Sequence, residues 1–548
     1  MINRVLKPLP NHLELREMMH APEKDTKGRL MRPQPNSRAM RVLFVTAEAE
    51  PLAKSGGLAD VSRALPIALR QQGVDVRVLL PGYPSAVEQL VNPHVEANLE
   101  PLLGVESVTL VSGYLPNSDV PVWLVIAPSL FTRAGGLYQA DDGQDWADNA
   151  LRFALFACVA TEIATGRVLD WKPDVVHSHD WHAGLVPLLL GMQNGLKPAT
   201  VFTIHNLAFQ GNFPQRVLPT VGIPEHLFNG DGIEFYGQIS YLKAALQYSD
   251  KITTVSPTYA NEILTPEFGC GFDGVLNARK EDFCGILNGI DNISWDPATD
   301  VHIAQRYSRN DISGKRVCKR EFQRTWGLEI NACRPLIGFV SRLAHQKMAD
   351  VVLEVVSEIV AAGGQFILLG EGDPALEVAF QRLQYDYPQR VAIHIGYDQA
   401  LAHGLQAGAD ILLAPARFEP CGLTQLYALR YGTVPVVRRT GGLADTVKDI
   451  ESSDQGTGFT FETADRYALM DTIQRALALY KEPLAWRRLQ LKGMIGDFGW
   501  DASAARYVTL YHEVSRLQHP APTVSWPTDE KGWHIAGESR KALYAGRV

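Results

Sequence analysis

The stretch RVLFVTAEAEPLAKSGGLADV, Arg41 to Val61, decides the fold. An apolar run typical of a buried strand leads into a loop with Lys54, Gly56 and Gly57, and a helix start follows. Adjacent glycines let the backbone approach a ligand closely, and a helix N-terminus beside a lysine attracts an anion. The stretch predicts a strand–loop–helix unit that binds a phosphate-bearing substrate; a tight turn without a ligand is the alternative.

A second loop of the same kind, RRTGGLADTV at residues 438–447, lies far downstream. One such loop in each half of the chain indicates two nucleotide-fold lobes that face one cleft. The near-repeat GGLADV/GGLADT is too short to establish a duplication.

Composition is that of an ordinary globular protein. The 548 residues are 46% hydrophobic and 20% charged, which is too much chain for one core, so two large domains are expected. A net charge of −8 argues against nucleic-acid or anionic-membrane partners. The six cysteines are scattered, and no apolar run approaches a membrane span. Together with an N-terminus that resembles neither a secretory signal nor a transit peptide, this predicts a cytoplasmic protein.

From Met40 onward, short apolar runs alternate with helix-length segments, which indicates parallel sheets with helices on both faces. The predicted strands are Val42–Thr46, Val76–Leu80, Val122–Ala127, Val175–Ser178, Thr200–His205, Ile252–Val255, Leu336–Val340, Phe366–Leu369, Ala392–Ile395, Ile411–Ala414 and Val434–Val437. A helix is expected after Lys347, ending at Gly363-Gly364. Pro66 is expected to break the helix that follows Gly57.

Turn-rich Leu287–Asp300 separates the two alternating halves and is the predicted hinge. The predicted organisation begins with an N-terminal extension (1–39) and an N-terminal Rossmann-like domain on the acceptor side (40–290). A C-terminal Rossmann-like domain on the donor side (291–517) and a C-terminal tail (518–548) follow.

The segment HSHDWH, His177 to His182, follows a predicted strand. It differs from a binuclear metal pattern, because Trp181 stands where that pattern needs a carboxylate and Asp180 comes one place early. We expect no metal here and interpret Asp180 as a contact to a polar substrate. The alternative is that the histidines satisfy backbone groups and pack.

Three further motifs close predicted strands. TIHN, at residues 203–206, places His205 in the same crevice as Asp180 and Lys54, because ligands bind at the carboxyl ends of parallel strands. In SRLAHQK, Arg342 and Lys347 flank a helix N-terminus, a suitable cradle for a diphosphate. In ARFEPCGLTQ, Glu419 can hold a sugar or ribose hydroxyl. The alternative roles are a turn cap for His205, a solvated basic turn for Arg342 and Lys347, and a helix cap for Glu419.

Taken in order, these motifs resemble the bacterial and plant-type glycogen (starch) synthases of glycosyltransferase family 5. The resemblance runs from about Met40 to about Leu517 and includes DGQDWADNALRF, ITTVSPTYA and ILNGID. It implies a GT-B fold, an α/β architecture with two Rossmann-like, doubly wound domains facing an interdomain cleft. It also implies transfer of glucose from ADP-glucose to the non-reducing end of an α-1,4-glucan, with retention of configuration and without a metal or cofactor.

The resemblance also implies residue roles. Lys54, Arg342 and Lys347 match cations on the donor phosphates, Glu419 a glutamate near sugar and ribose, and Asp180 and His205 contacts to the transferred glucose. These six are the predicted catalytic residues. The predicted substrate-binding residues are Gly56, Gly57, Asp60, Tyr138, Asn206, Asn288, Cys421, Gly422, Leu423, Thr440, Gly441, Gly442 and Leu443.

The chain departs from the family pattern at three places. Gly135-Gly136-Leu137-Tyr138 replaces Gly-Asn-Pro-Tyr, Ala416 stands where Ser is common, and Met348-Ala349 follows Lys347 where Gly is common. The Cβ of Met348 could alter how the backbone approaches the phosphates.

Three alternatives to this function are considered. The chain could be a related GT-B enzyme that uses UDP-glucose, a phosphorylase or sucrose-type synthase, or a glucan-binding pseudoenzyme. No motif compels a pyridoxal phosphate site, and the matched charged residues argue against a pseudoenzyme. The expected partners are ADP-glucose and glycogen or another α-1,4-glucan; the sequence does not indicate the oligomeric state.

Overall fold

The computed structural model describes residues 38–516. The predicted N-terminal extension, 1–39, lies outside the described residues except for residues 38 and 39, and the predicted C-terminal tail, 518–548, lies wholly outside them. None of the helices in 38–516 combines the length and apolar character that a membrane crossing requires.

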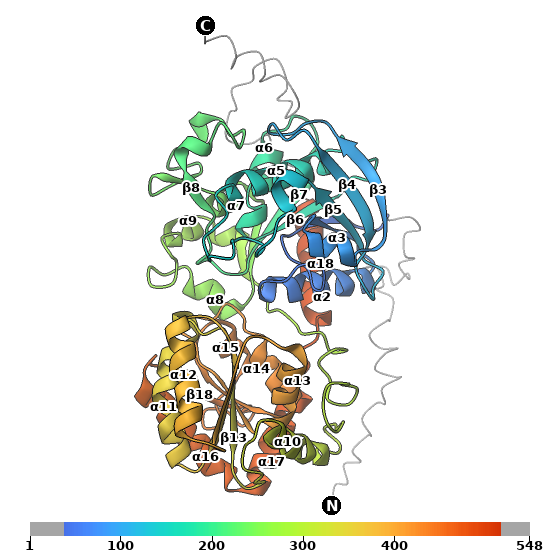
Figure 1. The fold of residues 1–548 in the computed structure, drawn as a ribbon. Coiled ribbons are helices and arrows are strands. Elements are labelled where there is room, and N and C mark those ends of the chain that lie inside the picture. The colour runs from blue at the N-terminus through green and yellow to red at the C-terminus, as the bar shows by residue number, and fades with distance from the viewer. Residues whose placement is uncertain (1–37, 517–548) are drawn as a thin grey trace, which may run out of the picture. The chain divides into compact units, whose positions relative to one another are not determined.

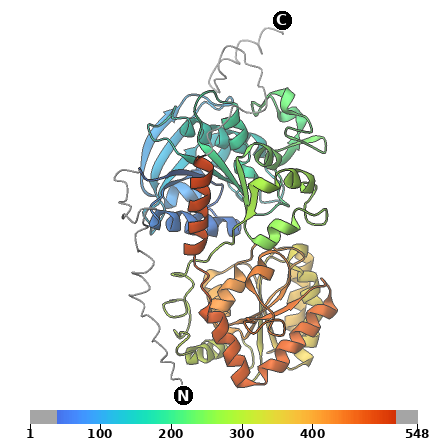
Figure 2. The ribbon, with the colours of Figure 1, turned by 180° about the vertical axis from the view of Figure 1, so that it is seen from behind.

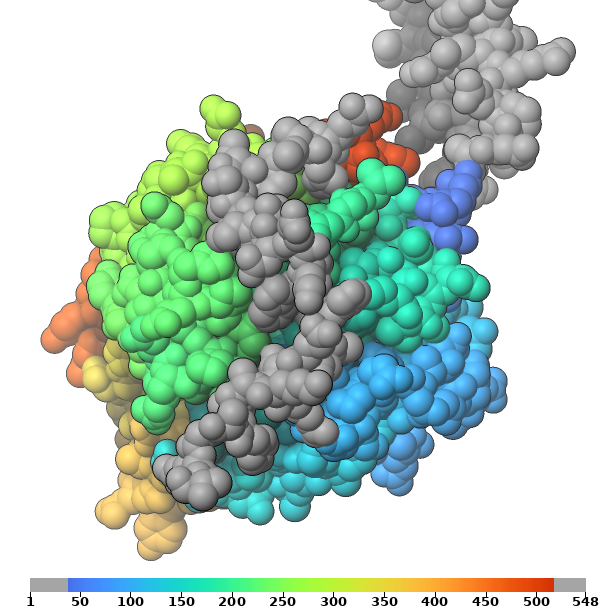
Figure 3. Space-filling view, turned by 90° about the horizontal axis from the view of Figure 1, so that it is seen from above, coloured from blue at the N-terminus to red at the C-terminus, as the bar shows by residue number. Residues whose placement is uncertain are grey.

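The first body is built on a nine-stranded sheet in the order β12-β11-β7-β6-β1-β2-β5-β4-β3. Its strands are β1 Arg41–Val45, β2 Asp75–Pro81, β3 Val91–Leu99, β4 Val108–Tyr114, β5 Pro121–Ile126, β6 Val175–His179, β7 Ala199–Ile204, β11 Lys251–Thr254 and β12 Phe283–Gly285. The strands from β12 to β5 run parallel, as predicted, but β3, β4 and β5 pair antiparallel. The wholly parallel sheet was therefore wrong at this edge, which lies at the surface in blue in Figure 3.

The helices of the first body are α2 Gly57–Gln71, α3 Pro84–Gln89, α4 Pro128–Phe131, α5 Asn149–Ala164, α6 Val186–Gly191, α7 Tyr241–Tyr248, α8 Pro257–Glu262 and α9 Asp273–Ala278. A small three-stranded sheet, β8 Asn212–Pro214, β10 Gln238–Ser240 and β9 Glu234–Phe235, lies apart from the main one. The predicted break at Pro66 was wrong, because α2 continues through it. Burial of Leu58, Leu65 and Leu69 on one face outweighs the single backbone hydrogen bond that proline forfeits.

The second body holds a six-stranded parallel sheet in the order β15-β14-β13-β16-β17-β18. The strands are β13 Leu336–Val340, β14 Gln365–Gly370, β15 Val391–Ile395, β16 Ile411–Ala414, β17 Val434–Arg438 and β18 Phe459–Phe461. The helices are α10 Ser313–Thr325, α11 Ala349–Ala361, α12 Pro374–Asp386, α13 Gln399–Gly408, α14 Thr424–Arg430, α15 Gly441–Thr446, α16 Arg466–Tyr480 and α17 Pro483–Ile495. The predicted helix after Lys347 is confirmed as α11.

Each face of this sheet carries its own hydrophobic core. Phe339 and Phe366 pack with residues of α11, α12 and α16, whereas Leu336 and Ile367 pack with residues of α10, α13 and α14. Figure 1 shows these helix groups around β13 and β18. Alternate side chains of one strand therefore pack into the cores on opposite faces of the sheet. This is the doubly wound arrangement that the alternating pattern predicts.

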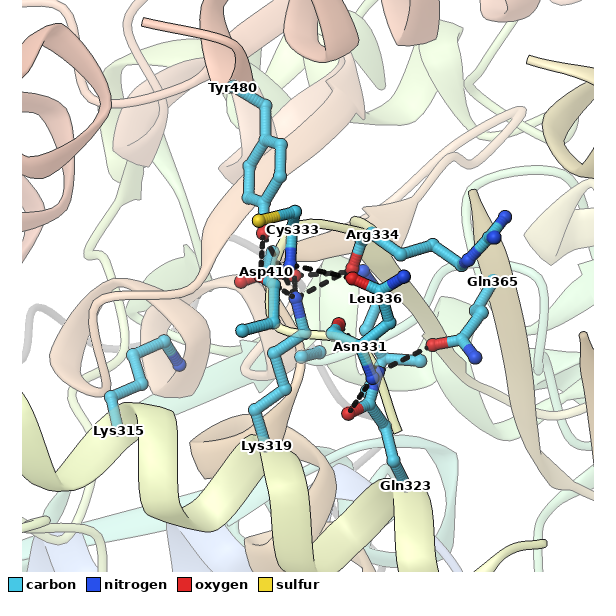
Figure 4. Close-up of polar contacts among 12 residues, drawn as sticks. Lys315, Lys319, Gln323, Asn331, Cys333, Arg334, Leu336, Gln365, Asp410 and Tyr480 are labelled. Atoms are coloured by element: carbon cyan, nitrogen blue, oxygen red, sulfur yellow. Dashed lines mark hydrogen bonds and ion pairs between the residues drawn. The ribbon is translucent and has the colours of Figure 1, made fainter. Parts of the chain in front are cut away.

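Two lysines one turn apart on α10 enter the second of these cores (Figure 4). The Lys319 ammonium lies 2.6 Å from Asp410 and 2.9 Å from the Tyr480 hydroxyl. Lys315 donates to the carbonyls of Gln406 and Ala407 in the last turn of α13, where a cation suits the helix dipole. Both ammonium groups are buried and hydrogen-bonded, so they join α10 to the strand and helix ends around it.

The last helix, α18 Asp501–Ser515, returns to the first body. It lies along α2 and the strands β6 and β7, as Figure 2 shows in red. The Tyr511 hydroxyl lies 2.8 Å from Nδ1 of His177, and Gln72 donates to the carbonyl of Asp501 over 2.8 Å. The chain therefore crosses between the two sheets twice.

Candidate active site

A buried carboxylate, which sequence analysis did not single out, holds the backbone of the first phosphate-type loop. Glu48 is 4% exposed, and its Oε2 accepts hydrogen bonds from the backbone N–H groups of Ser55 and Gly56, at 2.8 and 3.0 Å. Burial raises the pKa of Glu48, and these hydrogen bonds oppose the shift. This side chain holds the loop, and its signal in the sequence is weak, because Glu48 is only one of two acids, with Glu50, that follow the apolar strand.

Lys54 projects from this loop and pairs with Asp60 of α2 at 2.7 Å. Burial disfavours the charge of Lys54, but the neighbouring Asp60 outweighs it and raises the pKa of the lysine. Tyr397, an exposed residue after β15, also contributes to the raised pKa of the lysine. The structure brings Lys54 and Asp60 together, while Tyr397 was missed because nothing in its spacing marks it.

Tyr138 connects the loop to the end of β6. Its hydroxyl donates to Oε1 of Glu48 over 2.7 Å, and its ring stacks on His182 with centroids 4.3 Å apart. The departure at Gly135–Leu137 therefore leaves Tyr138 inside the group of predicted residues.

Asp180 follows β6 in a strained backbone conformation, φ 53° and ψ 178°. Residues other than glycine rarely adopt it, and such strain concentrates at functional sites. Its Oδ1 accepts a hydrogen bond from the backbone N–H of His205 at 2.7 Å. Burial raises the pKa of Asp180 to about 7, and the nearby Glu48 charge contributes.

The histidines of this region divide into structural and site residues. His177 is buried between Tyr511 and Thr203, 2.6 Å from the threonine hydroxyl, so packing explains it. His205 Nε2 lies 3.0 Å from Nδ1 of His179, and burial lowers the pKa of His205 to about 3. His205 is therefore neutral, able to orient a hydroxyl but not to supply a permanent charge.

The second body contributes the other group of predicted residues. After β13, Arg342 and Lys347 lie on either side of the short turn that leads into α11. The Lys347 ammonium pairs with the Glu419 carboxylate, which is 9% exposed. A cation and a carboxylate beside a helix N-terminus can hold a phosphate and a hydroxyl side by side.

The departure at Met348 has a structural reason. Met348 lies in the left-handed region at φ 53°, where glycine is favoured, and its side chain is fully buried in the α11 core. Its Cβ therefore enters the core, and Ala416 is buried in the same way.

Groups of the second glycine loop are already hydrogen-bonded to a side chain of the protein. Oε1 of Glu262 accepts hydrogen bonds from Gly441 N and from the Thr440 hydroxyl, both at 2.9 Å. Gly442 N donates to the carbonyl of Glu419. The loop therefore positions Glu419 and contacts α8 of the first body, a role that sequence reasoning missed.

The remaining predicted residues lie beside these groups. Asn288 is 6% exposed, and its Oδ1 is buried without a hydrogen-bond partner among the described residues. Cys421 is buried, which raises the pKa of its thiol to about 12 and makes it an inert packing group. Asn206 accepts from Ala208 N, Gly422 adopts φ +72°, and Leu423 precedes α14.

A metal centre is not formed by any part of the chain that the structure describes. Within 38–516, no three His, Cys, Asp or Glu side chains are grouped so that they could hold an ion.

Comparisons with known proteins agree with this architecture. The chain matches the family described as "Starch synthase catalytic domain" over residues 41–278 and "Glycosyl transferases group 1" over residues 323–489. The glycogen synthase of Burkholderia thailandensis is 51% identical over 477 residues, which cover 86% of this chain and 90% of that protein. The glycogen synthase of Thioalkalivibrio sulfidiphilus is 49% identical over 482 residues, covering 87% and 100%.

Among solved structures, the catalytic domain of starch synthase IV from Arabidopsis thaliana, bound to ADP and acarbose, matches with a TM-score of 0.80. It is 33% identical and covers 87% of this chain and 100% of that one. Two doubly wound bodies with polar strand ends define a GT-B glycosyltransferase, a hexosyl-transferring enzyme. At the identities and coverage given above, the chain belongs to the glycogen (starch) synthase family.

Proposed function

We propose that this enzyme transfers glucose from ADP-glucose to the non-reducing end of an α-1,4-glucan with retention of configuration. The observation that supports the proposal is that cationic side chains and the buried groups Asp180 and His205 follow the carboxyl ends of strands. Lys54 stands on one body, and Arg342 and Lys347 stand on the other.

The three cations take the donor diphosphate. As the bond between C1 of glucose and the β-phosphate breaks, negative charge grows on the departing oxygen, and fixed cations stabilise it without reorganising. Glu419, already paired with Lys347, accepts from a sugar or ribose hydroxyl. The exposed ring of Tyr397 offers a surface on which the base can stack.

Asp180 and His205 take the transferred glucose. Asp180 accepts a hydrogen bond from a glucose hydroxyl, while neutral His205 orients the ring and stabilises charge developing on it. The 4-hydroxyl of the acceptor attacks C1 on the face from which ADP leaves, and its proton passes to the leaving phosphate. Asp180 and Glu419 are the carboxylates that we place near sugar hydroxyls, and the proposed partner of each is a hydroxyl and not C1, so no covalent intermediate is invoked.

The test measures glucose incorporation into glycogen from ADP-glucose and from UDP-glucose, with and without EDTA. We expect ADP-glucose to be the better donor by at least tenfold, ~1.4 kcal/mol, and EDTA to have no effect. Equal rates would contradict the donor assignment, and loss of activity in EDTA with recovery on Mg²⁺ would contradict metal-independent transfer. Products that resist an α-1,4-specific glucosidase would contradict retention.

A further inference from the structure

His179 is a buried histidine that lies directly behind the proposed sugar-binding residues. It is the last residue of β6, precedes Asp180 and is 0% exposed, so it does not itself touch a substrate. Its ring stacks on Phe44, with centroids 3.9 Å apart, and its centroid lies 4.0 Å from that of His177. These two neighbours restrict the orientation of the His179 ring.

The two ring nitrogens of His179 have different surroundings. Nδ1 lies 3.0 Å from Nε2 of His205, the proposed contact to glucose. Nε2 is buried and has no hydrogen-bond partner within residues 38–516. The neighbouring His177 does not supply one, because hydrogen bonds to other side chains engage both of its own nitrogens. One hydrogen bond therefore joins His179 to His205, and the far side of the His179 ring carries an unpartnered nitrogen.

This hydrogen bond needs one donor and one acceptor, because both rings are neutral. Burial lowers the pKa of His179 well below its usual range and lowers that of His205 to about 3. A neutral imidazole carries a single N–H, so the pair has two arrangements. In the first, His179 donates from Nδ1 and its Nε2 is a bare lone pair. In the second, His205 donates from Nε2 and His179 is left with an unpaired N–H.

The burial of Nε2 of His179 distinguishes the two arrangements. A buried N–H group without a partner is rare in proteins, whereas an unpaired acceptor is tolerated more often. The first arrangement is therefore favoured, and it makes Nε2 of His205 an acceptor and puts the N–H of that ring on Nδ1. Because His205 is partly exposed and its Nδ1 is not hydrogen-bonded within the described part of the chain, this N–H is open to a ligand.

We propose that His179 is a positioning residue that fixes the tautomer of His205, so that His205 presents an N–H donor to the transferred glucose. The inference rests on the proposed function, because it concerns the sugar contact of His205. The two groups that face the glucose then have complementary roles: the Asp180 carboxylate accepts a hydrogen bond from one hydroxyl, and His205 donates one to a sugar oxygen. A fixed donor beside a fixed acceptor selects one orientation of the sugar.

The first test determines the tautomer in the full-length enzyme labelled with ¹⁵N at histidine. Imidazole ¹⁵N chemical shifts distinguish a protonated from a bare nitrogen, and the His205 signals are assigned by their loss in His205→Ala. We expect the proton of His205 on Nδ1 at neutral pH, and its redistribution toward Nε2 in His179→Leu, which lacks the donor. A proton on Nε2 in the unaltered enzyme would overturn the proposal, and this spectrum decides the question even if His179→Leu does not fold. The outcome does not depend on which nucleotide sugar is the donor, so the two proposals fail independently.

The second test compares His179→Leu with His179→Asn, because the asparagine amide can donate from about the place of Nδ1 and leucine cannot. His179→Leu should lower kcat/KM for ADP-glucose about 10- to 100-fold, the range for loss of a group that orients a ligating histidine, and His179→Asn should retain most of the activity. In the His205→Ala background, His179→Leu should have no further effect, because it acts through His205. Equal losses in the two His179 variants, or an undiminished loss in the His205→Ala background, would overturn the positioning role.

Discussion

At the scale of single residues, the candidate site contains cationic side chains and a carboxyl group whose protonation changes near neutral pH. Arg342 and Lys347 are cations on one body, and Lys54 has a pKa raised by Asp60 after burial has opposed it. Asp180, in contrast, has its pKa raised by burial to about 7. Donor binding by the cradle should therefore vary little over neutral pH, whereas sugar binding should depend on it.

We predict that Lys54→Ala, Arg342→Ala and Lys347→Ala each lower kcat by about 10²-fold or more, by comparison with removal of one oxyanion-hole donor. Each charge interacts more strongly with the departing diphosphate than with the bound donor. Steady-state kinetics with ADP-glucose measures this, and Arg382→Ala, an exposed arginine of α12, is the control. A raised KM with unchanged kcat would mean that the residue only binds the ground state.

We predict that kcat/KM for the donor falls as the pH drops through about 7, because Asp180 is then protonated and loses the negative charge that strengthens its hydrogen bond from a sugar hydroxyl. Asp180→Asn should abolish this acid limb, whereas His205→Gln should lower the rate without moving it, since His205 is neutral throughout. An unchanged limb in Asp180→Asn would contradict the assignment.

The same titration has a signature in stability. The folded pKa of Asp180 exceeds the ordinary 3.8, so the folded state binds the proton more tightly and loses stability as pH rises from about 4 to about 7. Asp180→Asn should therefore raise the midpoint of thermal unfolding at pH 8 more than at pH 5.

Glu48 provides a test of loop positioning. Glu48→Gln can still accept from Ser55 and Gly56, so we predict a nearly unchanged donor KM and an acid limb shifted to lower pH, because the Glu48 charge contributes to the raised pKa of Asp180. Glu48→Ala removes the acceptor that fixes the Ser55 and Gly56 N–H groups in their exposed loop, and it should raise the donor KM about tenfold, ~1.4 kcal/mol. Equal KM values in the two variants would show that Glu48 does not hold the loop.

At the scale of elements, α10 is attached to its sheet by polar groups inside a core. We predict that Lys319→Met lowers the free energy of unfolding by about 3–5 kcal/mol, because Asp410 is left as an unpaired buried carboxylate. The measurement is chemical denaturation followed by circular dichroism. Arg320→Met on the exposed side of α10 is the control, and an equal shift in both variants would contradict the role of the buried pair.

At the scale of the whole molecule, the two segments by which the chain crosses between the sheets contact each other. Ile290 pairs with Gly499 as an isolated parallel bridge, and Ile290 N donates to the carbonyl of Phe498 over 2.7 Å. Further along, Trp295 stacks between His403 and Tyr427, each centroid 3.8 Å away. The end of the predicted hinge segment is thus fixed to the second body, so we place the bending nearer residues 287–294 and the adjoining segment around Gly499.

We predict that the bodies close over the donor, because each carries only part of the proposed phosphate-binding site. Small-angle scattering should give a smaller radius of gyration with ADP and a glucan together than without ligand. Lys347→Ala should reduce this change, since it removes a contact that closure completes. An unaltered scattering profile at saturating ligand would count against the hinge; the domain boundaries stay a prediction.

The sequence by itself determined the features that depend on near neighbours. Leu336–Val340 and Ile411–Ala414 are strands at the predicted bounds, and the cradle motifs lie at strand ends as their spacing indicates. These features follow from local periodicity and turn chemistry, which a few consecutive residues encode.

Only the tertiary structure decided which distant groups meet. Tyr138 reaches Glu48 across 90 residues, and Tyr511 reaches His177 across 334. Strand β3, exposed on both faces, has no apolar alternation by which it could have been predicted, and α2 continues through Pro66 because its buried face packs. Contacts of this kind depend on complementary shape and burial between segments far apart in the chain, which no local pattern records.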